Sequence, residues 1–242
     1  MNQNKEFWKK LAPLTFPLAF QQLMQSLVSA SDAFMMGLID QSSLSAVSLA
    51  AQIAFVVSLF IFGLTGGGSI LAAQYWGKGS KEDEEQGFAI MMRPMALVGC
   101  LFTLAALFIP QLIMEIFTPD PHLIRLGSEY LRTVSLSYFL MCVTQTYLCI
   151  LRNSGQAMLA SMISSAGVVM NIVLNVILIF GWMGIPALGI TGAAVATVMG
   201  QIAAAITAVI INHKKNHEVK LDFRGFKPSL SIIRQIYAVG IP

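Results

Sequence analysis

The stretch LAPLTFPLAFQQLMQSLVSASDAFMMGL, residues 11–38, is apolar over a length that can cross a membrane, yet it contains an aspartate, Asp32. A membrane-spanning helix needs about 20 largely apolar residues. An ionisable side chain inside such a helix is energetically costly, and by default it marks an ion or substrate path. Asp32 is therefore the first candidate functional residue of the chain.

Polar residues recur along the same stretch with the spacing of one helix face. Gln21, Gln25, Ser29 and Asp32 follow one another at steps of four, four and three residues. This spacing stacks their side chains on one side of an α-helix. We expect that side to contact water or polar partners while the opposite side contacts lipid.

The composition of the whole chain predicts an all-α integral membrane protein. Hydrophobic residues make up 56% and charged residues 11%, with a mean hydropathy of +0.71. A soluble domain carries roughly 25% charged residues. Turn-forming residues divide the chain into six candidate spans, and we therefore predict a six-transmembrane-helix bundle. The predicted spans are residues 11–39, 44–72, 87–110, 123–151, 158–182 and 185–212.

Lysine and arginine residues predict the orientation of these spans. If the N-terminus is cytoplasmic, all of the 15 basic residues except Arg125 and Arg132 lie on the cytoplasmic side. Cytoplasmic loops carry such an excess of positive charge. The pattern predicts a multi-pass protein of the cytoplasmic membrane with both flanks cytoplasmic. The cations are scattered at helix ends, which gives no case for nucleic-acid binding.

Two other interpretations of these segments are weaker. The basic residues before the first apolar run imitate a secretory signal peptide, but the run is too long for a signal core and five further spans follow it. Cys100, Cys142 and Cys149 lack the spacing of a zinc site or a disulfide framework. We expect no cofactor.

A weak internal repeat predicts the domain organisation. FWKKLAPLTFP at residues 7–17 aligns with IIRQIYAVGIP at residues 232–242 through a basic residue, an aliphatic residue and the final proline. Parallel repeats of this kind occur in transporters. We predict an N-terminal six-helix lobe (residues 1–212), a cytoplasmic linker (213–231) and the truncated start of a second lobe (232–242). The missing partner would be a second six-helix lobe or a second copy of this chain.

Polar residues also recur in the other predicted spans. The ones we single out are Asn171 and Asn175 in the fifth span, Thr197 and Gln201 in the sixth, and Tyr138, Cys142, Gln145, Cys149 and Arg152 in the fourth. Interhelical hydrogen bonds, worth about 0.6 kcal/mol each, are the ordinary explanation for such residues. A carboxylate, two amides and a hydroxyl together are also the oxygen ligands that a hard cation requires.

Four motifs resemble those of one transporter family. They are DAFMMG at residues 32–37, LSAVSL at 44–49, NIVLNVILIFG at 171–181 and GITGAAVAT at 189–197. In this order they are similar to the first, fifth and sixth helices of multidrug and toxic compound extrusion (MATE) transporters. The resemblance implies one lobe of a twelve-helix, two-lobe antiporter that exports cationic or amphipathic compounds in exchange for Na+ or H+.

The resemblance also implies roles for individual residues. Asp32 is expected to bind or release the coupling ion, with Asn171, Asn175 and Thr197 as companions in a Na+ site. Pro17 is expected to act as a hinge, because proline removes a backbone hydrogen bond and allows a helix to bend. The residues expected to line the cavity are Gln21, Gln25, Tyr138, Gln145 and Gln201. Some family members carry a second aspartate at the position of Asn175, so Asp32 is the one acid that we expect in the site.

Two other function classes were weighed. An intramembrane serine protease needs a buried histidine base, but His122, His213 and His217 fall in loops or at helix ends and no GxSxG or HExxH motif is present. A flippase for lipid-linked precursors shares the architecture and stays the alternative. Basic residues inside the membrane would be expected to bind its phosphates, and the arginines here lie near helix ends. We therefore expect a transporter rather than an enzyme.

Overall fold

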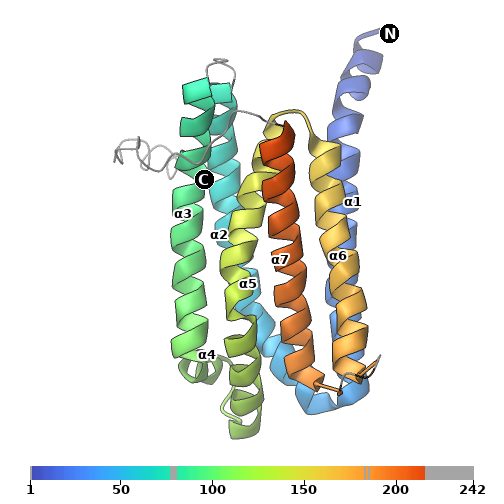
Figure 1. Ribbon diagram of the computed structural model, residues 1–242, viewed down its shortest axis with the longest axis vertical. Coiled ribbons are helices and arrows are strands. Elements are labelled where there is room, and N and C mark those ends of the chain that lie inside the picture. Colours follow the sequence, from blue (N-terminus) through green and yellow to red (C-terminus); the bar gives the residue numbers. More distant parts are fainter. Residues whose placement is uncertain (1, 77–80, 183, 185, 216–242) are drawn as a thin grey trace.

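The computed structural model describes the backbone of residues 2–76, 81–182, 184 and 186–215, and the side chains of 15–70, 87–182, 184 and 186–211 (Figure 1). This part of the chain is helical, which confirms the all-α prediction, and each predicted span has its helix. The helices are α1 Asn2–Ile39, α2 Gln41–Trp76, α3 Lys81–Phe108, α4 Pro110–Phe117, α5 Pro121–Asn153, α6 Ala157–Phe180 and α7 Gly189–Lys215.

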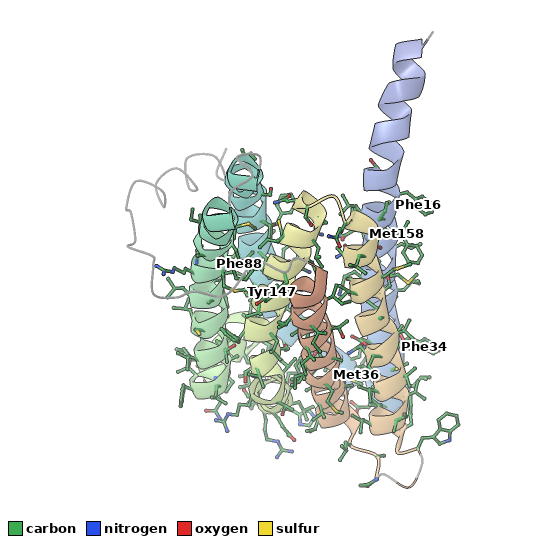
Figure 2. The ribbon with its side chains drawn as sticks, turned by 45° about the horizontal axis from the view of Figure 1, so that its top comes forward. Phe16, Phe34, Met36, Phe88, Tyr147 and Met158 are labelled. Carbon is green, nitrogen blue, oxygen red and sulfur yellow. The ribbon has the colours of Figure 1, made fainter. Side chains whose placement is uncertain are left out.

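Five of the long helices, α2, α3, α5, α6 and α7, are long and apolar enough to cross a membrane. The described part of α1 falls outside this set because the polar side predicted above lowers its hydropathy. The opposite side of α1 is apolar: the Phe16 and Phe34 side chains are 69% and 68% exposed and point away from the bundle in Figure 2. The chain is a multi-pass membrane protein, and α1 completes a six-helix lobe.

Helix α5 forms the centre of the bundle. It packs against α2, α3, α4, α6 and α7, and Figure 1 shows it between α2 and α3 on one side and α7, α6 and α1 on the other. Within its apolar window 67% of the residues are buried, compared with 22–33% in the other four spans. This central position explains why α5 contributes side chains to both the packed core and the cavity described below.

Helix α3 packs closely on α5. A methyl group at Gly99 would lie 2.9 Å from the Cα atom of Phe139, so the two backbones are in direct contact there. Toward the start of α3, the Phe88 and Tyr147 rings contact each other with centroids 5.1 Å apart (Figure 2). These contacts fix the orientation of α5 about its own axis.

The helices are joined at the turn-forming residues of the sequence, except that one connection contains a short helix, α4. The carboxylate of Asp40 accepts hydrogen bonds from the Ser43 backbone and hydroxyl and so caps the start of α2. The Ser43 hydroxyl, and then the Ser43 backbone N–H, hold the pKa of Asp40 below its usual range. Asp120 caps α5 in a similar way, through the His122 backbone N–H.

The exception is α4, which we did not predict. The predicted span 87–110 ends at Phe108, because Pro110 cannot continue a helix but fits its first turn. The domain prediction is only partly covered by the structure: α7 continues to Lys215, slightly beyond the predicted end of the lobe. The rest of the linker and residues 232–242 lie outside the described residues.

Candidate functional site

A cavity of about 230 Å³ lies between α1, α2, α5, α6 and α7. Asp32 is the one charged side chain lining it among the described residues. The remaining polar side chains of its lining are Gln25, Ser29, Tyr130, Ser137, Tyr138, Thr144, Gln145, Ser164, Asn171, Thr197 and Gln201. Polar side chains of four helices, α1, α5, α6 and α7, therefore share one interior space, and the one formal charge among its described lining residues is negative.

Asp32 is the end of a chain of hydrogen bonds that crosses from α1 to α7. The Nδ2 of Asn175 donates to Oδ1 of Asp32 at 2.5 Å and to Oδ1 of Asn171 at 3.2 Å. The Nδ2 of Asn171 in turn donates to the Thr197 hydroxyl at 3.4 Å, and that hydroxyl donates to the Ala193 carbonyl at 3.0 Å. The structure thus brings together the four residues that the sequence grouped, and their role in ion coupling stays a prediction.

Local helix geometry produces this arrangement. Asn171 and Asn175 are one turn apart on α6, so both amides lie on the side of α6 that faces α1 and α7. Asn175 is 0% exposed and Asn171 is 7% exposed, so neither amide can exchange its partners for bulk water. The hydrogen-bond chain supplies partners for the Nδ2 groups of both amides and for Oδ1 of Asn171.

One oxygen of this cluster has no hydrogen-bond partner among the described residues. Oδ1 of Asn175 is buried and accepts no hydrogen bond, although the same side chain donates to Asp32. A buried acceptor without a donor is costly unless something electropositive meets it. The donor set of one carboxylate, two amides and one hydroxyl suits a hard cation bound through oxygen. Among the described residues, no group of three His, Cys, Asp or Glu could hold a metal ion in another way.

Four of the five residues predicted to line the cavity do so: Gln25, Tyr138, Gln145 and Gln201. Gln21 does not line this cavity. Its side chain is 8% exposed, and its Oε1 accepts a hydrogen bond of 3.4 Å from Nη1 of Arg152, near the end of α5. Gln21 lies one turn before Gln25, at the level where Arg152 occupies the space between the helices.

Only part of the polar line on α5 faces the cavity. Cys142 is 0% exposed and packs against α3 at Gly99 instead of facing the cavity. The lining residues that sequence reasoning missed include Tyr130, Ser137 and Thr144, which are spaced by seven residues. That spacing is the signal that could have found them, because seven residues make close to two helical turns.

Helices α6 and α7 cross closely beside the hydrogen-bond chain. A methyl group at Gly167 would lie 3.2 Å from Cβ of Ala204, and one at Gly200 would lie 3.2 Å from Cβ of Asn171. Gly167 is one turn before Asn171, and Gly200 is three residues after Thr197. The absence of side chains at this crossing lets Asn171 and Thr197 come within hydrogen-bonding distance.

Exchanging one methyl group across this crossing tests the close approach. We expect Gly167→Ala to destabilise the protein less when Ala204→Gly has already removed the methyl group that the new alanine would contact. The two changes should show an interaction free energy of unfolding of about 0.5–3 kcal/mol. The measurement is thermal unfolding of the two single variants, the double variant and the unmodified protein. Strictly additive effects would contradict the crossing as described.

Comparisons with known proteins agree with this architecture. The family model MatE matches residues 17–177. The chain is 28% identical over 234 residues to the probable multidrug resistance protein NorM of Rhizobium meliloti strain 1021, covering 95% of this chain and 49% of that protein. It is 25% identical over 240 residues to the probable multidrug resistance protein YoeA of Bacillus subtilis strain 168, covering 97% and 52%.

A solved structure shows the same fold. It is the outward-facing conformation of a multidrug resistance MATE family transporter of the MOP superfamily, with a TM-score of 0.82 at 24% identity, covering 96% of this chain and 51% of its own. The chain spans about half the length of the curated relatives it matches. The family model matches residues 17–177, which is more than half of the chain, and the chain therefore belongs to the MatE family.

Proposed function

We propose that this chain forms the ion-coupling lobe of an antiporter that exports cationic or amphipathic compounds across the cytoplasmic membrane in exchange for Na+ or H+. The observation that carries the proposal is the contact between Asp32 of α1, which lines the polar cavity, and the buried Asn175 of α6 behind it. A carboxylate held there by a single amide can exchange that partner for an ion. Its charge state then links ion binding to the position of α1 against α6.

The chemistry follows from the groups around Asp32. A Na+ ion would be bound by the Asp32 carboxylate, the unpartnered Oδ1 of Asn175 and the other oxygens of the cluster. A proton on Asp32 would instead remove the negative charge from the cavity. In both cases the attraction between the cavity and a cationic substrate falls, because like charges and neutral sites do not hold a cation. Competition of this kind couples the entry of an ion to the release of a substrate.

The cavity of one lobe is too small for most drug-sized ligands. Its volume of about 230 Å³ is below the roughly 300–1,000 Å³ of typical ligand pockets. We infer that a second six-helix lobe, or a second copy of this chain, faces the lobe across a shared central cavity. The N-terminus and the segment after α7 would both be cytoplasmic, following the distribution of basic residues.

The cavity disfavours the flippase alternative. Lipid-linked precursors carry phosphates, which proteins bind with arginine, lysine or helix N-termini. No arginine, lysine or histidine is among the described residues that line the cavity, and Asp32 would repel an anion. The sign of the charge in the cavity therefore favours a cationic substrate.

Reconstituted transport tests the proposal. The protein, together with any second lobe it carries, is placed in liposomes with a fluorescent cationic dye, and a Na+ or an H+ gradient is imposed. We expect one of the two gradients to drive dye movement well above the rate without a gradient. Dye transport that is equal with and without both gradients would contradict ion coupling. Transport of an anionic lipid-linked precursor in place of the dye would support the flippase.

A further inference from the structure

Helix α1 is attached to α6 at a second point, far from Asp32. The hydroxyl of Ser161 on α6 donates a hydrogen bond of 2.9 Å to the carbonyl oxygen of Pro17 on α1, across 144 positions of sequence. Ser161 is 3% exposed and the Pro17 side chain is buried. Water therefore does not compete for this bond, which joins the two helices directly.

The bond lies at a proline inside α1. Proline has no backbone N–H, so Pro17 removes one hydrogen bond from the helix and favours bending there. Just beyond it, Gln21 accepts the hydrogen bond from Arg152 of α5. The segment from Pro17 to Gln21 is thus held by two other helices, α6 and α5.

The two attachments of α1 to α6 match in spacing. Residues 17 to 32 of α1 and residues 161 to 175 of α6 each span about four helical turns. Both helices run in the same direction, and Figure 2 shows Phe16 beside Met158 while Phe34 lies further along the pair. A slip of α1 along α6 would break both contacts at once, so the matched spacing sets the register that brings Asp32 to Asn175.

The two attachments differ in chemistry. The contact between Ser161 and Pro17 joins a neutral hydroxyl and a carbonyl, and an ion or a proton does not change it. The contact between Asp32 and Asn175 includes a carboxylate, which an ion or a proton does change. One attachment is therefore constant and the other is variable.

We propose that Ser161 is a positioning residue that fixes the Pro17 segment of α1 against α6, so that α1 pivots there when the contact between Asp32 and Asn175 changes. The inference rests on the proposed coupling role of Asp32. Without the anchor, α1 also samples positions in which Asp32 lies away from Asn175. The apparent ion affinity falls by the fraction of time spent in those positions.

Ser165 supplies a matched control. It lies one turn after Ser161 on the same helix, and its buried hydroxyl has no hydrogen-bond partner among the described residues. Ser161→Ala and Ser165→Ala therefore remove the same atom from the same helix, but only the first removes a bond to α1. Ser161→Thr keeps the hydroxyl donor.

The first readout is the ion dependence of dye efflux by the protein as it is expressed, with any second lobe it carries. We expect Ser161→Ala to raise the half-saturating concentration of the coupling ion about fivefold, which corresponds to about 1 kcal/mol, the usual net worth of one hydrogen bond. The maximal rate should stay close to that of the unmodified protein. Ser165→Ala should leave both values unchanged, and Ser161→Thr should restore the ion dependence. A loss of maximal rate without a change in half-saturation would overturn the positioning role.

The second readout does not depend on coupling. Spin labels at Phe34→Cys on α1 and Val173→Cys on α6, both exposed positions, report the distance between the two helices in a background where the three native cysteines are replaced. We expect a broader distance distribution with Ser161→Ala than with Ser165→Ala. Identical distributions would overturn the anchor whatever the transport assay gives. An Asp32→Asn variant that keeps its ion dependence would instead refute the coupling role alone, and the spin-label result would still decide whether Ser161 holds α1.

Discussion

Asp32→Asn is expected to reduce ion-driven dye efflux to the background rate while the protein still folds and reaches the membrane. Asparagine is nearly isosteric with aspartate, and the substitution removes a costly charge from a membrane helix. A neutral amide cannot take up a proton and cannot balance Na+, and Asp32 is the one charged group lining the cavity in the described part of the chain. The measurement is efflux under an imposed Na+ or H+ gradient, with the amount of protein quantified separately.

Two further variants separate the charge of Asp32 from its surroundings. Asn175→Ala removes the amide that donates to Asp32 and leaves Oδ1 of Asn171 without that donor, so we expect it to require a higher ion concentration but to keep coupling. Asp120→Asn removes a carboxylate that caps α5 at an exposed position, and we expect normal efflux. If Asp32→Asn exports at the unmodified rate, the polar side of α1 serves helix packing and the coupling role is wrong.

The spans and the four-residue cluster could be predicted from the sequence because the alternatives are energetically costly. These alternatives are apolar segments exposed to water and polar groups without partners inside the membrane. Apolar stretches of sufficient length must cross the membrane, and polar groups at helical spacing inside them must meet one another or water. Asp32, Asn171, Asn175 and Thr197 could therefore be grouped without coordinates. The bond from Asn175 to Asp32 is an example, because a partly buried carboxylate inside a membrane helix needs a hydrogen-bond donor.

Other features depend on the rotation and ends of helices, which periodicity does not determine. On α5 the polar residues cover more than one side, so spacing alone did not show that Ser137 and Thr144 line the cavity beside Tyr138 and Gln145. Cys142 instead packs against α3 at Gly99. For Gln21, the deciding factor is Arg152, which lies 131 positions away in sequence. Contacts over such separations are outside the reach of spacing rules.

The junction between α6 and α7 also depends on a close approach that the sequence alone does not show. A methyl group at Gly192 would lie 2.6 Å from the carbonyl oxygen of Leu178 and 2.8 Å from its carbonyl carbon. The same oxygen accepts a hydrogen bond of 2.9 Å from the Leu188 backbone. Because backbone atoms near a helix end cannot rotate away as a side chain can, a methyl at this position must push the start of α7 away from the end of α6.

Gly192→Ala is therefore expected to lower the stability of the lobe by about 1–3 kcal/mol, the usual effect of overpacking, which corresponds to roughly 2–12 °C in thermal unfolding for a chain of this size. The matched control is Gly66→Ala on α2, where an added methyl would meet no atom within 4 Å. Alanine is favoured over glycine in a helix by about 1 kcal/mol, so the control should melt at the same temperature or higher.

The effect of Gly192→Ala should extend to the site, because Ala193 and Ile179 pack in one cluster with Met35 and Met36, close in sequence to Asp32. Equal melting temperatures for the two variants would mean that α7 can move aside without loss, and that its register does not hold Thr197 in place.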